Sequence, residues 1–264
     1  MTVSGIVTLT TDFGTRDPYA GVMKAMVLTA NPDARLVDIT HEIPARDIVI
    51  AAFTLARAYE YFPAGTIHVA VVDPEVGEKR KSIAVLTQNY IFVGPDNGIF
   101  TMVLQREKSI EIREIKNSPF ISERISSTFH GRDVFAPCAG HLSAGRLFTD
   151  IGHELKQIRY LKYPKVAQNG NILAGEIVSV DSFGNMITNI SEHTFRSFVG
   201  KRRFEIFFAT ERFDAIMRHY SDASPGTSLL LFGSSGHLEI SMNSGNAEEY
   251  FMTSTGSAVT VRRY

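Results

Sequence analysis

Apolar runs and amphipathic stretches alternate along the first part of the chain. Short apolar runs predict strands at residues 6–10, 35–39 and 67–72, and the stretches after the first two carry apolar residues at helical spacing. This alternation is typical of a parallel sheet flanked by helices, with right-handed crossovers that bring the loops after the strands to one edge. We therefore expect an α/β domain over residues 1–160, with a mainly parallel sheet between helices.

Capping residues indicate where the helices begin. Asp17 and Pro18 predict the start of the first helix, with Tyr19 on its inward stripe, and Asp47 predicts the N-cap of the second. The Gly-Pro-Asp-Asn-Gly string at residues 94–98 either reverses the chain or presents backbone amides to a ligand. Further strands are predicted at residues 82–87 and 90–93, and a further helix at residues 134–142.

The pattern changes beyond residue 160, where helical periodicity largely disappears. A linker with Tyr-Pro and Asn-Gly strings is predicted over residues 161–171. Residues 172–264 then contain short β-like runs separated by Gly and Ser turns, which predict a smaller β-rich domain, a barrel or a sandwich. The runs lie at residues 175–180, 203–208, 228–232, 237–242 and 258–262.

Composition and charge narrow the possible functions. The 264 residues are 44% hydrophobic with a formal net charge of -1, which gives no electrostatic reason to expect nucleic acid or an anionic membrane as a partner. Cys138 is the single cysteine, so an intrachain disulfide and a thiolate metal cluster are excluded, and its apolar neighbours predict a buried thiol. Neither a signal peptide nor a bilayer-spanning run is recognised. We expect a cytoplasmic protein that acts on a small molecule.

A carboxylate, a guanidinium and an imidazole are the candidate reactive groups. Asp73 directly follows the buried strand at residues 67–72, at the end where open α/β sheets bind ligands. Arg80 ends the loop after this strand, and His130 lies in a later loop. Together such groups can hold a water molecule, lower its pKa and accept its proton without a metal. The alternative is a structural ion pair at the end of a loop.

Other polar residues follow strands or lie in turns. Asp12, after the first strand, either accepts the ribose hydroxyls of a nucleoside or caps its own loop. Asp181 and Asn185 suit an ammonium group and a purine edge, although composition alone favours a hairpin turn with Asx bonding. His41 and Glu42 are adjacent on an extended chain and point to opposite faces, so a metal site there is not expected.

Six short strings carry a resemblance to a known family. They are TTDFG at residues 10–14, DITHEI at 38–43, VVDP at 71–74, GPDNG at 94–98, TFHGRD at 128–133 and DSFGNMITNI at 181–190. Each string alone is a weak signal, but six in order at compatible spacing are a strong one. Across nearly the whole chain they closely resemble the S-adenosylmethionine hydroxide adenosyltransferase family, which is related to fluorinating and chlorinating enzymes.

The resemblance implies hydrolysis of S-adenosyl-L-methionine (SAM) to adenosine and L-methionine, with water attacking the ribose C5′ and with no cofactor. It also implies a homotrimer in which the substrate lies between the N-terminal domain of one subunit and the C-terminal domain of its neighbour. By motif, the catalytic residues are Asp73, Arg80 and His130. The implied substrate contacts are Asp12 for the ribose hydroxyls, Asn185 for adenine, Asp181 and Ser234 for the methionine end, and Phe129, Gly131 and Ser244.

Two alternatives share this substrate. A SAM-dependent halogenase of the same fold delivers a halide instead of water, but such relatives carry Tyr at the positions of Asp73 and His130. An anionic Asp73 repels a halide at close range by about 4 kcal/mol at an effective dielectric of about 20. A protein that binds SAM or adenosine without turnover does not need Asp73, Arg80 and His130 together. Hydrolysis is therefore the preferred interpretation.

Four positions depart from the family's pattern. Glu75 stands where Gly is usual, which costs about 1 to 2 kcal/mol if the backbone there needs a positive φ. Arg46 replaces an apolar or aromatic neighbour of the ligand. Gly233 and Ser235 replace Asn and an aromatic residue or Arg. These departures concern loop geometry and ligand contacts rather than the three candidate catalytic residues.

Overall fold

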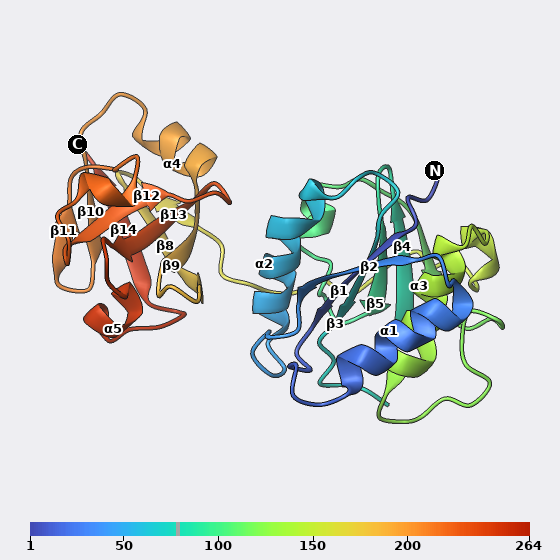
Figure 1. Ribbon diagram of the computed structural model, residues 1–264. Helices are drawn as coiled ribbons and strands as arrows, with labels where there is room; N and C mark the ends of the chain where they lie inside the picture. The colour runs from blue at the N-terminus through green and yellow to red at the C-terminus, as the bar shows by residue number, and fades with distance from the viewer. Residues whose placement is uncertain (78–79) are drawn as a thin grey trace. The chain divides into compact units, whose positions relative to one another are not determined.

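The computed structural model describes residues 1–77 and 80–264, so Glu78 and Lys79 of the loop after Asp73 lie outside the described residues. Internal contacts divide the chain into two units, Met1–Lys162 and Tyr163–Tyr264, and the division falls within the predicted linker. The first unit is an α/β domain with a mixed, mainly parallel sheet, and the second is an antiparallel, nearly barrel-shaped sheet (Figure 1). The predicted fold class is confirmed.

The strands of the first unit are β1 (Ile6–Thr11), β2 (Arg35–Thr40), β3 (Ile67–Val71), β4 (Ser82–Thr87), β5 (Ile91–Pro95) and β6 (Ser109–Glu114). They form one sheet in the order β2-β1-β3-β5-β4-β6, in which only the pairs made by β4 are antiparallel. Every residue of β3 is buried, as its apolar sequence predicts. Thr11 of β1 pairs with Val71 of β3, so the loops that carry Asp12 and Asp73 leave the sheet side by side.

Helices cover both faces of this sheet. They are α1 (Tyr19–Ala30), α2 (Ile48–Ala58) and α3 (Ala136–Ser143). Figure 1 shows α1 and α3 together on one face and α2 on the other. Gly140 of α3 permits this close approach, because a Cβ there would lie 2.7 Å from the Cβ of Ala30. The predicted burial of Cys138 is confirmed, and burial raises the pKa of its thiol.

One of the two predicted N-caps is confirmed. Asp47 accepts a hydrogen bond from a backbone N–H in the first turn of α2 at 2.9 Å. The prediction for Asp17 is wrong, because Pro18 itself occupies the cap position in a helical conformation and leaves Asp17 one residue too early. Tyr19 is 47% exposed rather than inward-facing. Local sequence signals therefore placed the helix correctly but not its first residues.

The predicted helix at residues 134–142 starts earlier than its apolar pattern indicates. A π-helical turn, Gly131–Phe135, follows His130 and continues directly into α3. Such turns are frequent at functional sites. A membrane-crossing helix, which needs about 20 apolar residues, is not found in the described part of the chain. Short 3-10 helices lie at Tyr59–Tyr61, Val103–Gln105, Phe148–Asp150 and Tyr220–Asp222.

The second unit contains the five predicted β-runs and elements that the sequence analysis missed. Its strands are β7 (Ala167–Asn169), β8 (Ile172–Val180), β9 (Met186–Ser191), β10 (Phe204–Phe208), β11 (Glu211–Phe213), β12 (Ser228–Phe232), β13 (His237–Met242) and β14 (Ala258–Arg263). Seven of them follow the order β11-β10-β14-β8-β9-β13-β12, and β7 pairs with β8. The strand β9 was not expected within the polar cluster at residues 181–190.

Two helices also belong to this unit, α4 (Glu192–Val199) and α5 (Ala247–Phe251). Helical periodicity was expected to disappear largely beyond residue 160, and α4 is a helix that this expectation did not place. Its N-cap, Ser191, accepts a hydrogen bond from the Thr194 N–H at 3.1 Å, and Phe195 and Phe198 pack into the core of the sheet. The apolar face of α4 spans two turns, which is too short for a clear helical period in the sequence.

Candidate functional site

The loop after β3 and the turn before α3 bring the three candidate catalytic side chains into contact. Arg80 donates from Nε and Nη2 to the two carboxylate oxygens of Asp73, with Nε at 3.0 Å from Oδ1. The same Nη2 lies 2.7 Å from Nδ1 of His130. Arg80 therefore joins a carboxylate on its own loop to an imidazole that is 50 residues away in the sequence.

Arg80 is held from several sides. Its side chain is 1% exposed, and its Nη1 donates to Oγ of Ser82 at 2.8 Å. The guanidinium carbon lies 5.4 Å from the centre of the Phe135 ring. A bidentate pair of this kind fixes the orientation of both partners. Because burying two charges is costly, its contribution is better assigned to geometry than to stability.

The contact with Arg80 decides which nitrogen of His130 carries a proton. A guanidinium has donors only, so Nδ1 of the ring accepts, and in the neutral ring the proton is on Nε2. Burial lowers the pKa of His130 and the charge of Arg80 lowers it further, against the opposing effect of Asp73 and Asp133. His130 is therefore neutral at pH 7, and Nε2 is a hydrogen-bond donor.

Asp73 and His130 border a cavity of about 400 Å³. This volume is within the range of small-molecule sites, roughly 300 to 1,000 Å³. Asp12 lines the same cavity from the end of β1, and its Oδ2 accepts the N–H of Arg46 at 2.9 Å. A carboxylate with one such bond has capacity for further donors, such as two hydroxyls of a sugar.

Three aromatic rings form much of the apolar part of the cavity, together with Val71, Pro74 and Val76. Phe13, Tyr19 and Phe129 meet edge to face with ring centres 5.3 to 6.0 Å apart. Gly131 allows this cluster to close, because a Cβ there would lie 3.2 Å from the Phe129 ring and 3.1 Å from Sδ of Met23. Phe129 and Gly131 were predicted from the sequence as contacts of the ligand, but Phe13 and Tyr19 were not. A signal was present, since Phe13 directly follows Asp12 and Tyr19 begins the helix after the same loop.

Asp133 anchors the loop that carries His130. Its Oδ2 accepts the Ser126 N–H at 2.7 Å, and its Oδ1 accepts from Nε of Arg132 at 2.7 Å. Burial alone raises the pKa of Asp133, but the bonds from Arg132 and from the Ser126 amide outweigh it and hold the pKa below its usual value. The charged, hydrogen-bonded carboxylate of Asp133 therefore fixes the backbone on both sides of His130.

His41 supports the loop of Asp12. Its Nδ1 lies 2.8 Å from Oγ1 of Thr11, which precedes Asp12, and its Nε2 lies 3.1 Å from Oδ1 of Asp38. The neighbouring Glu42 accepts a hydrogen bond from the Thr15 hydroxyl. Among the residues that the structure describes, no three or more His, Cys, Asp or Glu side chains are arranged to hold a metal ion.

In the second unit, Asp181 and Asn185 are bonded to each other. Oδ1 of Asp181 accepts the Asn185 N–H at 2.9 Å, and Nδ2 of Asn185 donates to Oδ2 of Asp181 at 2.9 Å. These bonds close the hairpin turn that composition favours. Gly184 in this turn has φ +81°, and a Cβ there would lie 2.0 Å from Oδ1 of Asn246. The turn therefore packs against the segment that follows Ser244, and the ligand roles of these residues stay predictions.

Ser234 lies in the hairpin between β12 and β13, next to a buried acidic residue. A Cβ at Gly233 would lie 1.6 Å from Oε1 of Glu239, so the Asn usual at this position would displace that carboxylate. Glu239 accepts from the Tyr220 hydroxyl at 3.3 Å. Burial raises the pKa of Tyr220, and the charges of Glu239 and Asp181 raise it further. Tyr220 and Glu239, which were not predicted from the sequence, are thus bonded to each other next to the hairpin that carries Ser234.

The departures at Glu75 and Arg46 have different consequences. Among the described residues, the non-Gly residues with positive φ are Arg46, Ala209, Ser244 and Met252, so the strain considered for Glu75 does not arise. Glu75 pairs with Arg159 at 2.7 Å. Arg46, in contrast, has φ 68°, which costs about 1 to 2 kcal/mol for a residue with a side chain. Its bond to Asp12 places this strain at the border of the cavity.

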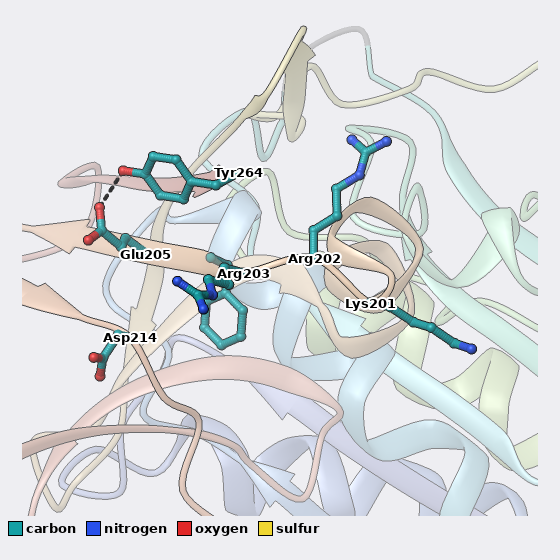
Figure 2. A pocket seen from close by; sticks show the side chains of 7 residues that line it. Lys201, Arg202, Arg203, Glu205, Asp214 and Tyr264 are labelled. Atoms are coloured by element: carbon teal, nitrogen blue, oxygen red, sulfur yellow. Dashed lines mark hydrogen bonds between the residues drawn. The ribbon is translucent and has the colours of Figure 1, made fainter.

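A larger hollow of about 710 Å³ lies in the second unit (Figure 2). Figure 2 shows Lys201 and Arg202 extending away from each other, and the Tyr264 hydroxyl bonded to Glu205. The described lining of this hollow includes no imidazole and none of the predicted site residues. The cavity of the first unit is therefore the candidate site, although it is the smaller of the two.

Known proteins match this chain along most of its length. Residues 7–152 match the SAM hydroxide adenosyltransferase N-terminal domain, and residues 175–260 match the C-terminal domain of the same family. A Thermus thermophilus protein named (R)-S-adenosyl-L-methionine hydrolase is 34% identical over 247 residues, which cover 90% of this chain and 92% of that protein. A fluorinase of an Actinoplanes species is 26% identical over 212 residues, with 70% and 71% covered.

A solved structure matches the fold. The crystal structure of an uncharacterized conserved protein from Thermotoga maritima superimposes with a TM-score of 0.91 at 35% sequence identity. The match covers 98% of this chain and 100% of that chain. The similarity therefore extends over both units.

Proposed function

Because this chain belongs to the SAM hydroxide adenosyltransferase family, we propose that it hydrolyses SAM to adenosine and L-methionine. The observation that carries the proposal is the contact of Arg80 with both Asp73 and His130 at the border of the cavity. The relatives at 31 to 40% identity that are named for this hydrolysis support it.

The chemistry requires a nucleophile more than an acid. The sulfonium leaves as a neutral thioether, so no proton is needed at sulfur. The bond from water oxygen to C5′ forms while the C5′–S bond breaks and its electron pair moves to sulfur. Arg80 stabilises the developing hydroxide, and Nε2 of His130 donates to the water oxygen and orients it. Asp73, whose carboxylate oxygens have lone pairs beyond those used by Arg80, takes the proton and releases it to solvent.

Positioning supplies much of the rate. Holding the water and C5′ in line is worth up to about 7 to 11 kcal/mol in well-oriented systems. In this proposal Asp12 binds the ribose hydroxyls, and Phe129 and Gly131 contact the nucleoside. Asn185 contacts the adenine, Asp181 and Ser234 hold the methionine end, and Ser244 is a further substrate contact. These roles rest on the family's motifs and on the residues that line the cavity in the first unit.

We further propose that the enzyme is a metal-independent, cofactor-free homotrimer in the cytoplasm, with each active site shared between neighbouring subunits. Arg80 already supplies the positive charge that a metal would otherwise contribute. The preference for the (R) form at the sulfonium is also part of the proposal, because the four hydrolase relatives carry it in their names.

One incubation tests hydrolysis against both alternatives. The protein, dialysed against EDTA, is incubated with SAM in 18O-water containing chloride and fluoride, and products are separated by mass spectrometry. We expect adenosine with one 18O at the 5′ position and methionine, formed faster from (R)-SAM than from (S)-SAM. A 5′-halogenated nucleoside would identify a halogenase. Recovery of unchanged SAM from a protein that binds it would identify a binding protein.

A further inference from the structure

The Gly-Pro-Asp-Asn-Gly turn after β5 is bonded to both ends of the loop that carries Asp73 and Arg80. Nδ2 of Asn97 donates to the carbonyl of Val72 at 2.8 Å, immediately before Asp73. The N–H of Asp96 donates to the carbonyl of Lys81 at 2.9 Å, immediately after Arg80. Two neighbouring residues thus bind the backbone at both ends of the loop, at Val72 and at Lys81. We call these two ends the stems of the loop that carries the ion pair of Asp73 and Arg80.

The side-chain amide of Asn97 is held in the orientation that the bond to Val72 requires. Asn97 is 9% exposed, and its Oδ1 accepts the Ile99 N–H at 3.2 Å, which orients the amide with its donor toward Val72. The turn lies close to β3 because Gly94 has no side chain, since a Cβ there would lie 2.3 Å from the carbonyl oxygen of Ala70. The position of the donor is therefore set by packing.

The carboxylate of Asp96 extends the same support. It accepts the Arg159 N–H at 2.7 Å, and the guanidinium of Arg159 pairs with Glu75 at 2.7 Å. Glu75 belongs to the loop after Asp73, so the turn holds this loop a third time through Arg159. Leu161 donates its N–H to Oγ1 of Thr101 at 2.7 Å, which keeps this segment against the turn.

Neither earlier interpretation of this turn explains these bonds. Reversal of the chain does not require a buried side-chain amide that reaches a carbonyl 25 residues earlier. Presentation of backbone amides to a ligand of the cavity does not fit either, and the N–H of Asp96 already has an acceptor. Among the described residues that line the cavity, none comes from residues 94–98.

We propose that Asp96 and Asn97 are positioning residues, which set the spacing of Asp73 and Arg80 without touching the substrate. This inference rests on the proposed hydrolysis. The stems need such support because the loop between them contains Gly77 at φ +82°, a residue that does not restrict the backbone. A misplacement of about 1 Å at a catalytic group can cost about 100-fold in rate.

The substitution Asn97→Asp tests the inference. It keeps the acceptor for Ile99 but replaces the donor with an oxygen that repels the carbonyl of Val72. We expect kcat to fall about 10- to 100-fold, while KM for SAM and the Kd for adenosine change less than twofold. The matched control is Asn117→Asp, because Asn117 makes the same kind of bond, from Nδ2 to the Asp150 carbonyl at 3.0 Å, away from the loop.

A second readout separates positioning from general destabilisation. If Arg80 moves away from His130, the pKa of His130 rises toward its ordinary value, because the charge of Arg80 helps to lower it. We expect this rise in the NMR titration of His130 in Asn97→Asp and not in Asn117→Asp. If Asn97→Asp does not fold, Asn97→Ala removes the donor without adding charge, and Asn117→Ala is then its control.

The outcomes are distinct. Wild-type kcat and an unchanged His130 titration in the Asn97 variant would overturn the inference, and so would equal losses in kcat and in adenosine affinity. Absence of SAM hydrolysis by the wild-type protein would instead overturn the proposed function. The NMR titration would still test the support of the loop in that case, because it does not depend on turnover.

Discussion

At the scale of single residues, the proposed reaction depends on the protonation state of His130. The neutral ring accepts from Arg80 through Nδ1, whereas a protonated ring has donors on both nitrogens and meets a guanidinium of like charge. Burial and Arg80 both lower its pKa, so the structure favours the neutral form. Protonation therefore breaks the contact that, in the proposed reaction, orients His130 toward the attacking water.

This gives a prediction with a definite sign. Because the pKa of His130 is lowered from 6.5 in the folded protein, kcat should be constant above pH 6.5 and fall at lower pH through that lowered pKa. Folded-state stability should decline over the same range, since the unfolded chain binds the proton first. His130→Ala should reduce kcat by about 10² to 10³ through loss of the Nε2 hydrogen-bond donor and abolish this limb, whereas the exposed His193→Ala should keep it. A persisting limb in His130→Ala would exclude His130 as its origin.

At the scale of elements, backbone strain is stored in two kinds of place. At Arg46 the positive φ accompanies a hydrogen bond to Asp12 and a position in the cavity wall. A role in the site can therefore explain why the strained conformation is retained. At the end of α5, Met252 has φ 51° in a left-handed cap and is 90% exposed. The exposed side chain of Met252 buries little apolar surface that could offset the strain.

We therefore predict that Met252→Gly stabilises the protein. Glycine adopts the left-handed conformation without steric cost, and it is the preferred residue at this position of a helix end. The free energy of unfolding should rise by about 0.5 to 1 kcal/mol, measured by urea denaturation. Met252→Ala is the matched control and should not gain, because alanine keeps the Cβ. An equal gain in both variants would show that loss of the exposed side chain, not relief of the backbone, is responsible.

At the scale of the whole molecule, the predicted site residues fall into two groups. Asp12, Asp73, Arg80, Phe129, His130 and Gly131 belong to the first unit, and Asp181, Asn185, Ser234 and Ser244 belong to the second. The proposed trimer combines a first unit from one subunit with a second unit from its neighbour. Two variants that are inactive for different reasons can then compensate each other within one assembly.

Mixed assemblies test this arrangement. Asp73→Asn and Asn185→Ala should each lose most activity alone. Co-expressed in equal amounts, they should regain about a quarter of the wild-type rate, because about one site in four combines two intact halves in a ring of heterologous contacts. Light scattering should give about three times the 29.3 kDa chain mass. A monomer, or mixed assemblies as inactive as each variant alone, would place both halves of the site in one chain.

Features that depend on neighbours in the sequence were predictable. The apolar runs identified β1 to β5 in the first unit and β8, β10, β12, β13 and β14 in the second, but not β6, β7 or β11. Asp47 identified a helix start because an N-cap acts within three residues. Asp17 failed because Pro18 already occupied the cap position. The strand β9 and the helix α4 failed because the first follows a polar turn and the second is only two turns long.

The sequence by itself determined the fold class, the buried strand before Asp73 and the family to which the motifs point. Only the tertiary structure decided that Arg80 reaches His130, that Phe13 and Tyr19 line the cavity, and that Asn97 holds the stem of Asp73. The physical reason is the distance along the sequence over which each kind of signal acts. Hydrophobic period and capping act between residues a few positions apart, whereas these contacts join residues 25 and 50 positions apart, whose meeting depends on how the strands are ordered in the sheet.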